Sequence, residues 1–289
     1  MYNFIYGPKK HILKNPVDFL IFVKRLLPKY ANSLPDSGVV TLFQQVKRKK
    51  GNSNSMVETG VGASTLALFL SAYLFKKKLY SFDHNPDKIS LIRSVINEAI
   101  CTPLNIKISD YWLPIPSDST DKFTGISCLK EFNTNFDFGF FDSAHSLEIL
   151  TKEISSFYKI ANKNFILGID DGEKINNRYF HYDFVNMIRS KMNLKKIKNT
   201  NDNKCDYFYK EVHEYLIKKS KKVKKLSTFF ERNFEKDLYF NFFGNDISYE
   251  ALDDKKNIKN FEYKNIFKEM SNQDKSIYKN RISFFEVNK

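Results

Sequence analysis

Val57-Glu-Thr-Gly-Val-Gly-Ala-Ser-Thr65 carries two glycines separated by one residue. Glycine adopts positive φ angles readily and has no side chain, so this spacing favours a turn whose backbone passes close to a ligand. The preceding residues, 55–57, are apolar enough to end a buried strand, and residues 64–75 form an apolar run long enough for a helix. A strand, a glycine turn and a helix in this order are typical of a nucleotide-binding site.

Two features distinguish this turn from a dinucleotide fingerprint. Thr65 stands where the fingerprint has Gly or Ala, and an acid, Glu58, lies two residues before Gly60. Both features disfavour NAD as the ligand. A Gly-x-Gly pair alone is more often an ordinary turn than a ligand site, so the positions of the next acidic residues are needed to decide.

The pattern Glu58-x-Gly60-x-Gly62, followed by Ser64 and Thr65, resembles the first motif of the class I S-adenosylmethionine-dependent methyltransferases. The resemblance implies that the glycines face the methionyl part of the cofactor and that the acid organises the loop. It also implies S-adenosylmethionine as the cofactor, with these five residues as part of its binding site.

The composition is that of a folded protein. The chain has 289 residues, of which 42% are hydrophobic, so it can bury a sizeable core as one large domain or as one domain with additions. A net charge of +14 would suggest an anionic partner. However, Lys, Asn, Ile, Phe and Tyr are abundant together, as in proteins from A+T-rich genomes, and we therefore do not expect nucleic-acid binding.

The cysteines and the apolar runs indicate the compartment. Cys101, Cys128 and Cys205 are widely spaced and odd in number, which indicates neither a disulfide framework nor a zinc site. No apolar run reaches the roughly 18 residues that a membrane span needs, and the first residues lack the layout of a secretion signal. We expect a cytoplasmic protein without a membrane span.

A second predicted strand, residues 78–83, ends on Asp83, 21 residues after Gly62. An acid in this position can accept hydrogen bonds from both ribose hydroxyls, in a nicotinamide site as well as in an S-adenosylmethionine site. We therefore count Asp83 and its neighbour His84 among the candidate cofactor-binding residues. The alternative is that Asp83 only caps the helix that begins near Pro86.

A third strand is predicted over residues 105–109, ending on Asp110. In the resembled family this region borders the adenine, which implies that Asp110 binds the exocyclic amine. A loop acid without a ligand role is the alternative.

Two more buried strands are predicted to end on acids. Residues 136–142 end on Asp142, and residues 164–169 are followed by Asp170 and Asp171. Because parallel strands bring their carboxyl ends to one edge of a sheet, these three carboxylates should converge there. Three like charges in one crevice repel unless a cation neutralises them, which favours Mg²⁺ or another hard divalent cation. The alternative is that these acids are exposed and cap the following helices.

These acids, together with Asp142-Ser-Ala-His145, resemble the Mg²⁺-dependent O-methyltransferases, especially those that act on sugars of natural products. The resemblance implies Asp142, Asp170 and Asp171 as metal ligands, and Asp142 and His145 as catalytic residues. A histidine can take the proton of an acceptor hydroxyl as methyl transfer begins. A packing or capping role is the alternative for His145. Ser143 departs from the family, which usually has glycine at this position.

The chain is predicted to have three parts. Residues 1–50 form a helical lead-in, residues 51–210 form the S-adenosylmethionine-binding core, and residues 211–289 form an accessory region. The lead-in has apolar residues at helical spacing over residues 16–30 and a second helix over residues 39–46.

The end of the core and the accessory region carry further predicted elements. A helix over residues 178–192 precedes the last two strands of the core, over residues 194–198 and 205–209. The accessory region begins with a lysine-rich helix over residues 211–237, and residues 282–287 could form a short strand. This region could serve as a lid or as the contact of a homodimer.

The predicted fold is a doubly wound α/β structure with a mostly parallel, seven-stranded, Rossmann-like sheet. The predicted function is S-adenosylmethionine-dependent, metal-assisted O-methylation of a hydroxyl on a sugar or another small polar metabolite. Two alternatives remain open: a NAD-type oxidoreductase, which would share the glycine turn and Asp83, and a non-catalytic binding protein that keeps the fold.

Overall fold

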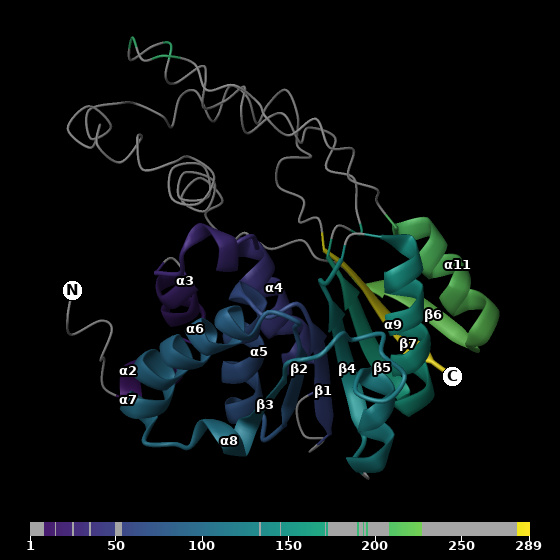
Figure 1. Ribbon diagram of the computed structural model, residues 1–289, viewed down its shortest axis with the longest axis horizontal. Coiled ribbons are helices and arrows are strands. Elements are labelled where there is room, and N and C mark those ends of the chain that lie inside the picture. The colour runs from purple at the N-terminus through teal and green to yellow at the C-terminus, as the bar shows by residue number, and fades with distance from the viewer. Residues whose placement is uncertain are drawn as a thin grey trace.

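The computed structural model places a twisted sheet between two layers of helices (Figure 1). It describes residues 9–14, 16–24, 26–34, 36–49, 54–132, 134–144, 146–170, 172, 190, 193, 195, 208–226 and 282–289.

The sheet has seven strands in the order β3-β2-β1-β4-β5-β7-β6. Their bounds are β1 Ser55–Thr59, β2 Leu79–Phe82, β3 Trp112–Ile115, β4 Phe136–Phe141, β5 Ala161–Ile169, β6 Lys222–Leu226 and β7 Ser283–Asn288. Strands β1 to β5 pair in parallel, and β7 runs antiparallel to both of its neighbours. The prediction of a doubly wound, mostly parallel, seven-stranded sheet is confirmed.

Helices cover both faces of this sheet. In Figure 1, α4, α5 and α6 lie on one face and α9 and α11 on the other. The helices are α2 Lys9–Lys14, α3 Pro16–Lys24, α4 Asp36–Lys47, α5 Ala63–Leu74, α6 Pro86–Ile96, α7 Thr102–Leu104, α8 Ile108–Tyr111, α9 Leu147–Ile160 and α11 Tyr209–Lys219, with short helical turns η1 Lys29–Ala31, η2 Asn97–Cys101 and η3 Ile126–Phe132.

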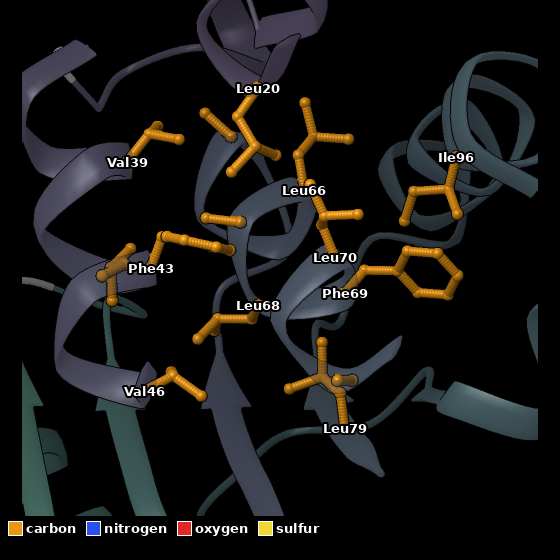
Figure 2. Packing of buried hydrophobic residues seen from close by; sticks show 14 of the residues in the cluster. Leu20, Val39, Phe43, Val46, Leu66, Leu68, Phe69, Leu70, Leu79 and Ile96 are labelled. Atoms are coloured by element: carbon orange, nitrogen blue, oxygen red, sulfur yellow. The ribbon is translucent and has the colours of Figure 1, made fainter. Parts of the chain in front are cut away.

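Each face of the sheet has its own hydrophobic core, because neighbouring residues of a strand point to opposite faces. On β5, Ile166 packs with α4 and α5, whereas Phe165 and Leu167 pack with α9. Figure 2 shows the first core, to which Phe43 of α4 and Leu66 of α5 both contribute. The predicted helical lead-in therefore forms part of the main core, through α3 and α4.

Three strand-end hydrogen bonds hold the loops that follow the parallel strands at one edge of the sheet. The Gly60 N–H donates to Phe82 O at 2.9 Å, the Asp142 N–H to Thr59 O at 3.0 Å, and the Asp170 N–H to Phe141 O at 3.0 Å. The order of the strands reverses between β1 and β4, and in such sheets ligands bind at the carboxyl edge beside that reversal.

The third strand differs from the prediction. Residues 105–109 do not form a strand; β3 begins at Trp112, after the short helix α8. Asn105 has a left-handed φ of +53° and ends α7. Trp112 sets the position of the strand, because its buried indole N–H donates to the Ser81 hydroxyl on β2 at 2.9 Å.

The end of the sheet also differs from the prediction. Most residues of the helix predicted over 178–192 and of the strands predicted over 194–198 and 205–209 lie outside the described ranges, and Tyr209 begins α11. The helix predicted over 211–237 ends at Lys219, since residues 222–226 form the edge strand β6, and residues 227–237 lie outside the described ranges. The exposed lysines of β6 discourage pairing with another chain. The strand predicted over 282–287 is confirmed as β7, so residues beyond 210 contribute two strands to the sheet.

Candidate functional site

The glycine turn is held in one conformation by its neighbours. Gly60 has a φ of +81°, which favours glycine. A Cβ at this position would lie 1.8 Å from the backbone oxygen of Asp142, so the turn packs directly on the loop after β4. The Gly62 N–H donates to Thr65 Oγ1 at 2.9 Å.

Glu58 lies fully buried beneath this turn. Its carboxylate accepts hydrogen bonds from the hydroxyls of Ser64 at 2.6 Å, Ser81 at 2.7 Å and Thr65 at 2.9 Å. Burial raises the pKa of Glu58 to about 7, and these hydroxyls, together with the positive charge of Lys88, oppose the rise. The hydroxyls of Ser64 and Thr65 therefore face the carboxylate inside the protein.

Asp83 follows β2 and borders the glycine turn. Its Oδ2 accepts from the Val61 N–H and its Oδ1 from the Asn85 N–H, both at 2.9 Å, and Lys88 Nζ lies 3.5 Å from Oδ2. The cap of α6 is Asn85, whose side chain accepts from two backbone N–H groups of the first turn. The alternative in which Asp83 caps this helix is therefore wrong. His84 is exposed, and its Nδ1 lies 4.0 Å from Asp83 Oδ1.

Asp142 and Asp170 line one pocket at the carboxyl edge of β4 and β5, as their positions in the sequence predict. The other lining residues are Phe141, Ser143, Ala144, Leu150, Glu153 and Phe208. Asp171 and His145 lie outside the described residues. Within the described ranges, no three His, Cys, Asp or Glu side chains are arranged to hold a metal ion.

Asp110 does not join these residues. It lies on α8, before β3 begins, and therefore at the opposite edge of the sheet from Asp83. The residues that follow β3 at the carboxyl edge are Pro116, Ser117 and Asp118. Because β3 begins at Trp112 and not at residue 105, Asp110 lies away from the glycine turn.

Glu153 also lines this pocket, although the sequence did not predict it. It lies on α9, is fully buried, and accepts a hydrogen bond from the Ser119 hydroxyl in the loop after β3. Burial raises the pKa of Glu153, and the nearby carboxylate of Asp118 also raises it. The sequence pattern indicated that Glu153 is buried, because it lies in the same stripe of α9 as Leu150, Ile154 and Phe157.

No helix in the described part of the chain is long and apolar enough to cross a membrane.

No protein-family model and no curated protein matches the chain. Among solved structures, an SAH-bound methyltransferase of Podospora anserina is 15% identical, with 65% of this chain and 70% of that chain covered and a TM-score of 0.39. The TDP-rhamnose 3'-O-methyltransferase CalS11 of calicheamicin biosynthesis is 13% identical, with 68% and 84% covered and a TM-score of 0.39. A protein from Corynebacterium glutamicum is 13% identical, with 75% and 91% covered and a TM-score of 0.46. Likenesses this low assign neither a family nor an activity to the chain.

Proposed function

We propose that the chain is an S-adenosylmethionine-dependent methyltransferase. The observation that supports this most is the glycine turn at the reversal of strand order, with Glu58 buried beneath it and Asp83 beside it. Ligands with a nucleoside part bind in this crevice in open α/β sheets. Glu58, beneath the turn, and Asp83, after β2, are the two acids that the methyltransferase resemblance requires.

The residues around the turn would divide the work of holding the cofactor. Gly60 and Gly62 would lie along its methionyl part. Asp83 would accept from the ribose, because a carboxylate has about four acceptor positions and the contacts to Val61, Asn85 and Lys88 leave capacity on it. Glu58 would fix the shape of the loop from inside. Bound S-adenosylmethionine would supply a methyl group on a positively charged sulfur.

We further propose that the acceptor is a hydroxyl group of a sugar or another small polar metabolite, which binds beside Asp142 and Asp170 at the carboxyl edge of β4 and β5. Both carboxylates supply the oxygen ligands that Mg²⁺ prefers, and Asp171 would be the third ligand. Mg²⁺ would lower the pKa of the bound hydroxyl. His145 would remove its proton, beside Asp142, while the protein holds the acceptor in line with the methyl group.

A NAD-type oxidoreductase is the weaker candidate. The usual dinucleotide-binding order is 3-2-1-4-5-6 with parallel strands, whereas here the antiparallel β7 lies between β5 and β6. Such an enzyme would also leave the shared position of Asp142 and Asp170 without a role. A non-catalytic binding protein would bind the cofactor without methylating a hydroxyl compound.

Calorimetric titration with S-adenosylmethionine, with and without Mg²⁺, tests the proposal. We expect saturable binding of the cofactor, and no saturable quenching of fluorescence on titration with NADH. No binding at millimolar cofactor would contradict the methyltransferase function. A second titration, with Mg²⁺ against the Asp142→Ala variant, tests the metal: an affinity for Mg²⁺ equal to that of the unaltered protein would remove Asp142 from the metal site.

A further inference from the structure

Three buried polar atoms without partners lie where β1, β4 and α9 meet. They are Thr59 Oγ1, at the end of β1, Ser143 Oγ, in the loop after β4, and Glu153 Oε2, on α9. Each is shielded from solvent and makes no hydrogen bond with the described residues. Leaving a buried polar group unpaired costs about 1–3 kcal/mol, so three such atoms in one place need an explanation.

These atoms belong to one cluster. The hydroxyls of Ser143 and Thr59 both lie close enough to the Glu153 carboxyl to lower its pKa in part, although neither reaches hydrogen-bond geometry with it. The Ser119 hydroxyl donates a hydrogen bond to the other carboxyl oxygen of Glu153, Oε1. The cluster therefore has one oxygen held in place by the protein and three polar atoms left to pair.

The cluster borders the pocket lined by Asp142 and Asp170, because Ser143 and Glu153 are also among its lining residues. The pocket has a volume of about 20 Å³, which is room for one group the size of a water molecule and not for a ring. The described acids that face it are Asp142, Asp170 and Glu153, with Asp118 close behind.

We propose that Thr59, Ser143 and Glu153 form a subsite that receives one hydroxyl group of a polyol or sugar. A hydroxyl donates one hydrogen bond and accepts two, so it can pair with all three atoms at once. This subsite deepens the proposed function, since it would select an acceptor that carries a hydroxyl in addition to a reacting one.

The chemistry of the cluster favours a hydroxyl over an ammonium group. Burial raises the pKa of Glu153, whereas the hydroxyls of Ser119, Ser143 and Thr59 lower it in part. The hydroxyls of Thr59 and Ser143 each donate and accept, and the Glu153 carboxyl accepts, so together they suit a hydroxyl group. A buried ammonium would require an ionised partner and would lose its own hydration, which is costly unless the pairing is complete.

Binding of myo-inositol to the full chain, without S-adenosylmethionine, tests the subsite. The methyl groups of Thr59, Ala144 and Leu150 lie in or beside the cluster and serve as NMR reporters when selectively labelled. We expect saturable shifts of these methyl signals, and about tenfold weaker binding for Ser143→Ala and for Glu153→Leu. The Glu153→Gln variant keeps a donor and an acceptor and should stay within about threefold of the unaltered protein.

Matched variants separate this role from a structural one. Ser156 lies one turn further along α9 and pairs with Ser127, so Ser156→Ala should leave inositol binding unchanged. Thr59→Val removes an unpaired hydroxyl with little change of shape, and should weaken binding without lowering the stability of the free protein. Both expectations differ from what a packing defect would produce.

Three results would overturn the subsite. One is the absence of saturable shifts with inositol, and another is tighter binding of ethylammonium than of inositol. The third is inositol binding that Ser143→Ala and Thr59→Val leave unchanged, because the cluster would then hold only a buried water. Since no cofactor is present in this experiment, its failure is distinct from a failure to bind S-adenosylmethionine.

Discussion

The α-carbon of Gly60 lies against the backbone oxygen of Asp142, so closely that a Cβ on residue 60 would stand 1.8 Å from that oxygen. The glycine turn after β1 and the acid after β4 therefore form one continuous wall at the carboxyl edge of the sheet. This contact couples the proposed cofactor site to the proposed acceptor pocket, and a change at residue 60 should disturb both.

The Gly60→Ala variant should lose S-adenosylmethionine binding and be less stable than the unaltered protein. The positive φ of +81° alone costs about 1–3 kcal/mol for a residue with a side chain, and the clash with Asp142 adds to it. Urea unfolding measures the stability. Gly62→Ala is the control for stability, since a Cβ there would meet Ala31 O at 3.2 Å, and its φ of 176° is open to any residue. Equal losses of stability in the two variants would contradict this account.

Stability should fall as the pH rises from about 4.5 to about 7, because of Glu58. The carboxyl has a pKa of about 7 in the folded protein against 4.5 for a free side chain, so the folded state binds more protons in this window. The stabilisation is complete below pH 4.5, is lost as the pH rises, and is absent above pH 7. Because Glu58 is fully buried, its pH-dependent contribution to the free energy of unfolding reaches at most about 3 kcal/mol.

The Glu58→Gln variant tests this assignment by urea unfolding across the same window. Glutamine does not titrate, so the decline of stability between pH 4.5 and pH 7 should be smaller in the variant. An unchanged decline would mean that another group causes the pH dependence.

Asp83→Asn should weaken S-adenosylmethionine binding by about tenfold or more, because the amide loses the negative charge that holds Val61, Asn85 and Lys88 in place. Calorimetry measures the change. His84→Ala is the matched control, since its side chain is 90% exposed and lies next to Asp83 in sequence. Equal affinity in the two variants would place the ribose elsewhere.

Lys77→Met should destabilise the protein by about 3–5 kcal/mol, because it leaves the carboxylate of Asp137 buried without its cation. The two side chains are 0% and 1% exposed, and Nζ lies 2.8 Å from Oδ2. The double variant Lys77→Met/Asp137→Leu should recover most of this loss, since it removes both charges. Thermal unfolding measures the stability of the two variants. A double variant less stable than Lys77→Met would show that the unpaired charge of Asp137 does not cause the loss of stability.

Local patterns in the sequence were enough to predict the parallel core. Strands β1, β2, β4 and β5 are short apolar runs that end on an acid or a glycine turn, and the helices between them have clear apolar stripes. Because parallel strands share one carboxyl edge, these patterns also predicted that Asp142 and Asp170 would meet, and both line the same pocket.

The sheet's outer strands could not be assigned from local patterns. Residues 105–109 have a strand-like alternation, but the burial of Trp112 against Ser81 places β3 further along the chain. Strand β6 is rich in lysine and reads as part of a helix, yet it pairs with β7 from the far end of the chain. Such pairings depend on contacts between distant residues, which no window of the sequence contains.

The order of acids and glycines along the chain determined by itself which strand ends share one edge of the sheet, because strand direction and the period of the side chains follow from local sequence. Only the tertiary structure decided that the hydroxyls of Ser64 and Thr65 turn inward to Glu58, that Asp110 lies at the opposite edge, and that Glu153 joins Thr59 and Ser143. These outcomes depend on which buried groups find partners, and that is settled when helices and strands pack together.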